Sequence, residues 1–265
     1  DPTRNGSTGG TVASADALDK TKNAQQGTEN NGKVTIAAAV GIAAAQDIAL
    51  ARLGAVTVAL TGDLNVSAAN AMNLATSGVG AALNSSSALS VGIGVSLGIS
   101  NNVTAATIAD GAHIIAARDI SVAATSSEGT GADFVDKLTA VAVAGASSSK
   151  VGVAGALAVA VSNSQTLAAI GDNVRVDEAQ DLSVVAGSTN KLSAKAWTGT
   201  RSSGSVAVGA SVATVFSNRD ITAAVGAGGN VAAASVTVTA DAYKLAAPAS
   251  PDFTDLSALK DDILT

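Results

Sequence analysis

The sequence contains no cysteine and very few aromatic residues. Without cysteine, disulfide bonds and thiolate metal sites are both excluded. Aromatic residues make up 2% of the 265 residues, whereas hydrophobic residues reach 47%, most of them alanine and valine. A globular core of this length normally depends on large side chains, each of which buries much apolar area. The composition therefore favours a thin, elongated stack with closely packed backbones over a compact α/β enzyme.

Charged residues are also scarce, at 14%, and the formal net charge is -6. A mildly acidic chain without a basic stripe is a poor candidate for binding nucleic acid. The most apolar stretch, residues 34–60, carries Gln46, Asp47 and Arg52 in its middle. Because each of these side chains is costly in hydrocarbon, no membrane insertion is expected.

An internal repeat is the strongest feature of the sequence. Three segments alternate branched with small residues and end on Ser-Asn, at Asn101, Asn163 and Asn218, which are 62 and 55 residues apart. Two further landmarks follow each time: a short strand running into a turn, and a second alternating segment (for example residues 106–111 and 119–122). Three landmarks in a constant order indicate a unit that recurs about four times.

Alternation with a period of two, broken by turn residues such as Asp110-Gly111, predicts strands and not helices. Sandwiches and propellers alternate too, but their cores or blades use aromatic residues. We therefore predict an all-β fold, a right-handed parallel β-helix (β-solenoid), over residues 32–247, with about four repeats of 55–62 residues. A solenoid period of roughly 20 residues gives about ten coils. Small residues are expected to line a narrow interior.

Asn101, Asn163 and Asn218 are the candidate structural residues of the repeat. We expect them at corners of the stack, where two roles are open. Each side chain either bonds the backbone of the next coil, forming a ladder, or serves ordinary turn chemistry.

The two end segments depart from the repeat. Residues 1–31 are polar and predict an N-terminal arm or cap. In residues 248–265, Ser250 and Pro251 form a helix start signal, which predicts a short C-terminal amphipathic helix. This helix either caps the open end of the solenoid or docks on a neighbouring subunit. Its candidate docking residues are Phe253, Leu256, Leu259 and Ile263.

No catalytic, cofactor-binding or metal-binding residue is assigned from the sequence. Residues 94–98 match the G-x-S-x-G motif of a nucleophile elbow, but they lie inside an alternating strand, and His113 is the only histidine. The densest charged cluster contains Arg175 and Asp177, on which a β-helix polysaccharide-degrading enzyme could depend. A solvated charged face is the better interpretation of that cluster.

Several phrases of the sequence resemble the repeats of large filamentous adhesins and leukotoxin-type surface proteins of Gram-negative bacteria. They are Lys150 to Val159 (KVGVAGALAV), Leu167 to Val174 (LAAIGDNV) and Asp181 to Val184 (DLSV). The resemblance covers about residues 33–245. It implies a secreted parallel β-helix, displayed at the bacterial cell surface as a stiff rod for adhesion, aggregation or biofilm. The implied partner is a host or neighbouring-cell surface.

A second hypothesis is a self-assembling extracellular filament or matrix subunit, whose partners are copies of itself placed end to end. The residues 1–31 or the C-terminal helix would then bridge between subunits. A β-helix enzyme is the third hypothesis, and it is the weakest because no acid cluster is accompanied by the aromatic residues that a sugar cleft favours.

Overall fold

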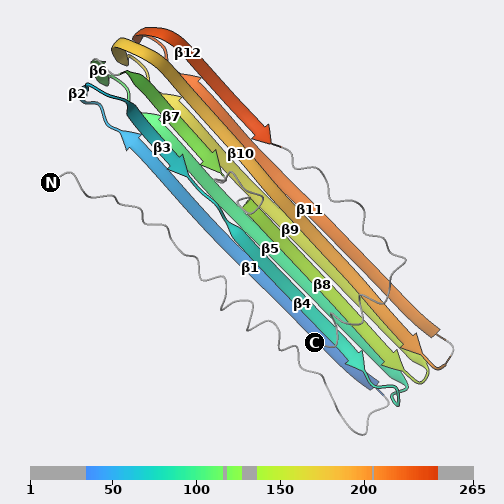
Figure 1. Ribbon diagram of the computed structural model, residues 1–265. Helices are drawn as coiled ribbons and strands as arrows, with labels where there is room; N and C mark the ends of the chain where they lie inside the picture. Colours follow the sequence, from blue (N-terminus) through green and yellow to red (C-terminus); the bar gives the residue numbers. More distant parts are fainter. Residues whose placement is uncertain (1–33, 116–117, 127–135, 205, 244–265) are drawn as a thin grey trace.

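The computed structural model describes residues 34–115, 118–126, 136–204 and 206–243. In this part of the chain every regular element is a β-strand, and neighbouring strands pair in parallel. The strands lie along one common axis (Figure 1). The fold is therefore all-β with parallel sheets, as the alternating sequence predicts. The predicted arm at 1–31 and the predicted C-terminal helix at 248–265, with its docking residues, lie outside the described residues.

Four long strands form one sheet, here called the long-strand sheet. Its order is β1-β5-β9-β11, and each strand has 20 residues: β1 (Val34–Leu53), β5 (Leu89–Ile108), β9 (Val151–Ile170) and β11 (Val206–Val225). The pairing continues without a shift along the whole length of these strands. Alternating, turn-free sequences explain this length, because nothing in residues 151–170 interrupts the extended backbone.

The second sheet, here called the return sheet, has eight strands and carries the chain back to the start of the next long strand. Its strand β10 runs along both halves of the sheet, pairing first with β6 and β7 and then with β8. The strands are β2 (Thr57–Ala59), β3 (Leu64–Ala69), β4 (Asn73–Leu83), β6 (His113–Ile115), β7 (Asp119–Ser126), β8 (Asp136–Ser148), β10 (Arg175–Ser202) and β12 (Asn230–Tyr243).

One complete pass through both sheets takes a whole repeat. Val34 pairs with Leu89, Leu89 with Val151, and Val151 with Val206, so paired residues lie 55, 62 and 55 positions apart. The expectation of about 20 residues per coil is therefore wrong. The reason is physical: a period of two says which face a side chain takes, but it does not say how far a strand runs before it turns.

The second pass is longer than the first at one corner of the return sheet. Ala69 pairs with Thr125 and Asn73 with Lys137. The first two residues are four positions apart in the sequence, whereas their partners are twelve positions apart. The strands on both sides nevertheless pair in parallel, so extra length at this corner does not disturb the sheets.

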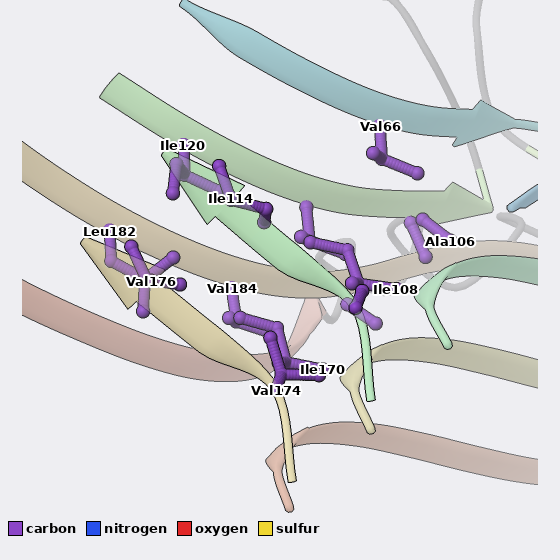
Figure 2. Packing of buried hydrophobic residues seen from close by; sticks show 14 of the residues in the cluster. Val66, Ala106, Ile108, Ile114, Ile120, Ile170, Val174, Val176, Leu182 and Val184 are labelled. Atoms are coloured by element: carbon purple, nitrogen blue, oxygen red, sulfur yellow. The ribbon is translucent and has the colours of Figure 1, made fainter. Parts of the chain in front are cut away.

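Two different kinds of packing fill the space between the sheets. Near the ends of the long strands, large branched side chains such as Ile108, Ile114 and Leu182 are almost completely buried (Figure 2). Each contributes about 1.5 to 3 kcal/mol by leaving water. Equivalent residues of successive passes lie side by side in this cluster, because the register places Val184 beside Val122.

Near the starts of the long strands the sheets are separated only by small residues. A methyl group built on Gly78 would overlap the carbonyl oxygen of Val95, and one on Gly80 would overlap that of Ile93. Gly92 and Gly94 face the backbone of β8 in the same way. The prediction that small residues line a narrow interior is confirmed for this region.

The turns after the long strands β5, β9 and β11 share one backbone feature. Gly111, Asn173 and Gly228 all have positive φ values, of 72°, 55° and 72°. Glycine adopts this conformation without strain, and asparagine tolerates it better than most residues do. Asp110 accepts a hydrogen bond from the backbone N–H of Asp172, at 2.9 Å. Asp172 accepts one from Ala227 at 2.8 Å, so these carboxylates connect successive turns.

Candidate functional site

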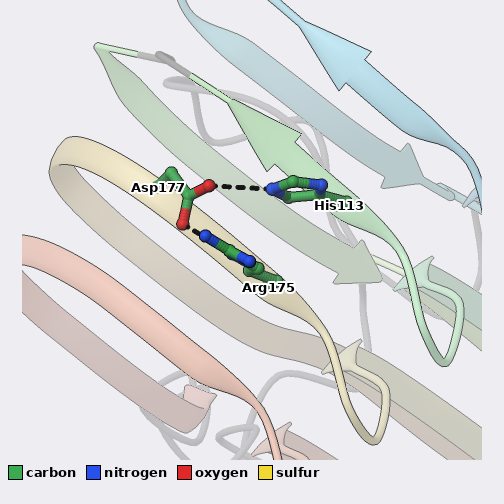
Figure 3. A network of polar contacts seen from close by, with 3 residues as sticks. All are labelled: His113, Arg175 and Asp177. Atoms are coloured by element: carbon green, nitrogen blue, oxygen red, sulfur yellow. Dashed lines mark hydrogen bonds and ion pairs between the residues drawn. The ribbon is translucent and has the colours of Figure 1, made fainter.

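Three charged or ionisable side chains meet on the outer surface of the return sheet (Figure 3). His113 in β6 pairs in register with Arg175 in β10, and Asp177 lies two residues further along β10. One carboxylate oxygen of Asp177 lies 2.8 Å from His113 Nε2, and the other accepts a hydrogen bond from Arg175 Nε at 2.9 Å. The cluster therefore joins neighbouring passes of the chain by a diagonal cross-strand pair.

Asp177 is the charge centre of this cluster. Hydrogen bonds from Arg175 and from His113 hold the pKa of the Asp177 carboxyl below its ordinary value. The same contact with Asp177 raises the pKa of the Arg175 guanidinium. Both shifts favour the ionised forms, so the pair stays charged over the physiological pH range.

The register of β10 against β12 changes between Val176 and Ala179, an interval that includes Asp177. Val176 pairs with Val231, but Ala179 pairs with Ala233, so β10 has one more residue than β12 here. Glu178 lies in this bulge with a φ of 61°, which is unusual for a residue other than glycine. The bulge separates the charged cluster from the regular pairing that resumes at Ala179.

The contacts of the cluster are hydrogen bonds and ion pairs among its own three members. No hydroxyl or thiol among the described residues is hydrogen-bonded to His113. Ser96, the serine of the G-x-S-x-G match, is fully buried and donates a hydrogen bond to the carbonyl oxygen of Thr76. In the described ranges no group of three or more His, Cys, Asp or Glu side chains could hold a metal ion.

Replacing Asp177 with asparagine should change how stability depends on pH. A carboxyl whose pKa is lowered by folding stabilises the protein above its unfolded pKa, about 4, and that stabilisation is lost as pH falls through the folded pKa. The melting temperature of Asp177→Asn should therefore lie below that of the wild type at pH 7, and the two should converge as the pH falls through the lowered pKa of Asp177. Thermal denaturation across this range checks the prediction. Asp181→Asn, which replaces an exposed carboxylate on the same strand, is the control. A difference in melting temperature between Asp177→Asn and the wild type that is the same at every pH would contradict the prediction.

The three candidate asparagines lie in the middle of long strands and not at corners. Asn101 pairs with Asn163 and Asn163 with Asn218, so all three occupy one row across the sheet. Asn163 Nδ2 donates to Asn101 Oδ1 at 3.0 Å, a bond between side chains and not to backbone. Gln46 occupies the same row in the first long strand. An amide row therefore crosses the outer face of the long-strand sheet.

On one side of this amide row, the outer face of the long-strand sheet is apolar. It comprises alternate residues of 34–44, 89–99, 151–161 and 206–216, beginning with Val34, Leu89, Val151 and Val206. This surface is here called the apolar face. Thr214 is its one polar member, and none of these described positions is charged. Most of the inward positions between them are glycine, serine or alanine, and at Gly92 and Gly94 the backbone of the other sheet leaves no room for a side chain, so the large side chains point outward.

The apolar face contains a shallow hollow of about 430 Å³ across β5, β9 and β11. Its floor is formed where the outward positions carry almost no side chain, at Gly155 and the neighbouring Ala210. Its walls include Ile93, Leu157 and Val208. A methyl group built on Gly155 would have no neighbour within 4 Å, so the hollow is open to solvent.

Comparison with known proteins gives no relative. No family model matches the chain, and no curated protein or solved structure does. Among the described residues, no helix is long and apolar enough to cross a membrane. The functional argument therefore depends on the residues and their arrangement.

The sequence analysis missed two features, the contact between His113 and Asp177 and the apolar face of the long-strand sheet. The contact between His113 and Asp177 could have been found by aligning repeats at the 62-residue spacing, which places His113 beside Arg175. The apolar face could not, because alternation alone does not tell which set of residues points outward. The amide row had a signal in the constant position of asparagine, but the strand was expected to end there.

Proposed function

We propose that the chain is a segment of a right-handed parallel β-solenoid with a structural and adhesive role at a bacterial cell surface. The observation that carries the proposal is the constant parallel register of four long strands, Val34 to Leu89 to Val151 to Val206. Stacked units of this kind add up into a stiff rod, because each contacts only its neighbours. The right hand follows the general preference of parallel crossover connections.

The surface chemistry supports a structural role over an enzymatic one. In the charged cluster, His113 and Arg175 each form an ion pair or hydrogen bond with Asp177. His113 belongs to one pass of the chain, and Arg175 and Asp177 belong to the next. The solenoid would present an extended face to a host or neighbouring cell, outside the producing bacterium. The resemblance to filamentous adhesin repeats supports the same location.

A binding experiment tests the adhesive role. Fluorescent beads coated with the purified chain should be retained on epithelial or bacterial cell layers several-fold more than beads coated with a folded protein of similar acidic charge. The Val184→Asp variant is the matched control, because a carboxylate at this buried position should prevent the chain from folding. It shows whether retention depends on the folded structure. Equal retention of all three bead preparations would reject adhesion by this segment.

A filament or matrix subunit is a second candidate, favoured by the edges of the long-strand sheet. In the described part of the chain, β1 pairs only with β5 and β11 only with β9. Each edge therefore presents 20 residues of backbone able to pair with another chain. Electron microscopy over a concentration series should then show fibres that lengthen with concentration. Short particles of constant length at every concentration would reject this candidate.

A further inference from the structure

The apolar face is too large and too exposed to be an ordinary surface of a monomer. Phe216 and Ile36 on it are 58% and 62% exposed, and Val40, Ile42 and Val212 are comparably open. Soluble proteins seldom expose a continuous apolar patch beyond a few hundred Å² unless it binds something. The face needs an occupant, and its size, charge and shape indicate which.

The size of the face matches what a stable pair of chains buries. Four strands about 4.8 Å apart, with six outward positions about 6.6 Å apart along each, cover roughly 700 Å². Two copies in contact over six such rows of positions would bury about 1,400 Å² in total, within the range of specific protein interfaces. Flat sheets pack in this manner at about 10 Å separation, with strands aligned to within about 30°.

The charge distribution favours a second copy over a membrane surface. The chain carries a net charge of -6, yet the apolar face has no charged position, so two copies can approach face to face without repulsion there. Surfaces that lie on anionic membranes combine apolar residues with lysine, arginine and tryptophan. The described positions of the apolar face have none of the three.

The shape of the face is self-complementary. Phe216 is its one aromatic residue, on β11, and the hollow lies at Gly155 and Ala210. Phe216 is six positions beyond Ala210 on the same strand, or roughly 20 Å. A two-fold axis across the strands, midway between these positions, would place each phenylalanine over the hollow of the other copy. It pairs residues 208–218 of β11 with the same residues of the other copy, so that four rows of each apolar face, at 210–216, meet apolar rows. Such an isologous contact closes on itself and does not propagate.

We propose that two copies of this chain pair through their apolar faces, with strands antiparallel and Phe216 of each copy seated in the hollow at Gly155 of the other. The amide row with Asn101 and Asn163 then forms the last row of the contact, opposite the row of Val208 in the other copy, where polar side chains can remain solvated at the edge. This pairing is lateral and goes beyond the adhesive role. It differs from the end-to-end association of a filament, which would use the open edges of β1 and β11.

The test is sedimentation velocity of the full chain from about 1 to 100 μM. The wild type should shift from monomer to dimer within this range. Gly155→Leu should raise the dimer Kd at least tenfold, because leucine fills the hollow that receives Phe216, and the open space at Gly155 allows the monomer to fold. Phe216→Ala should have an effect of similar size, since it removes the side chain that fills the hollow.

Gly199→Leu is the matched control. Gly199, like Gly155, is a strand glycine with no neighbour within 4 Å of an added methyl group, but it belongs to β10 in the return sheet. Its dimer Kd should equal that of the wild type. A wild-type chain that stays monomeric to 100 μM would overturn the proposal, as would a Gly155→Leu chain that dimerises normally. Concentration-dependent fibres without a discrete dimer would overturn it too, while leaving the filament hypothesis standing.

Discussion

Replacing Gly80 with valine should lower the free energy of unfolding by more than about 4 kcal/mol, or prevent folding altogether. Gly80 lies in β4, and any side chain there would overlap the backbone carbonyl of Ile93 in β5. β5 is held in the opposite sheet by its pairing with β1 and β9, so its backbone carbonyl cannot move away as the end of a flexible side chain can. The two sheets would have to separate along this line, and the neighbouring contact of Gly78 with Val95 would be lost with it.

Urea denaturation followed by circular dichroism measures this effect. Gly199→Val is the control, because the same change in an exposed strand position meets no neighbour within 4 Å. Valine favours the strand conformation more than glycine does, so the control should be neutral or slightly stabilising. If Gly80→Val unfolds within about 1 kcal/mol of the wild type, the close contact of the two sheets is wrong.

Replacing Val184 with aspartate should cost at least about 4 kcal/mol, because it places an unpaired carboxylate in a closed apolar cluster. Val184 has no exposed surface, and it packs between the equivalent residues of neighbouring passes, Val122 and Val238. No cationic side chain belongs to the buried cluster around it. The carboxyl would remain protonated or the strands would open, and either outcome destabilises the fold.

The repeat supplies its own control for this substitution. Val238 occupies the equivalent position in β12 but is 46% exposed, since no described strand pairs with β12 on the side away from β10. Val238→Asp should cost less than about 1 kcal/mol, because the carboxylate keeps its water. Chemical denaturation measures the loss of unfolding free energy in each variant, and the ratio of the two losses reflects the difference in burial between Val184 and Val238. Equal losses at the two positions would contradict the stacking order.

The strand content and the parallel pairing could be predicted from the sequence, because period-two alternation and recurring landmarks both follow from stacked strands. The pass length could not, since Ser162-Asn163 looks like the end of a strand. In the structure Ser162 points inward and Asn163 outward, so the strand continues through both. Two consecutive polar residues need not end a strand. Here the Asn163 side chain is exposed to solvent, and the small Ser162 side chain is buried between the sheets.

The orientation of the alternating residues was also outside what the sequence could decide. Burial usually selects the larger set, so Val91, Ile93 and Val95 would ordinarily be expected inside. They point outward because Gly78 and Gly80 of the opposite sheet leave no space for them. This constraint comes from the preceding strand, β4, and alternation alone does not show that β4 lies directly against the inner face of β5. The charged cluster was missed because its members come from different repeats, since His113 and Asp177 are 64 residues apart.

The longer second pass has a consequence for how such a chain can change over evolutionary time. Extra residues between Thr125 and Lys137 leave the pairing on both sides parallel, so insertions and deletions are tolerated at that corner. A single inserted codon inside β9 would be far more harmful. Every side chain beyond it would exchange faces, and branched residues would be forced against glycine. Length polymorphism should therefore collect at the corners, while the long strands vary only by substitution.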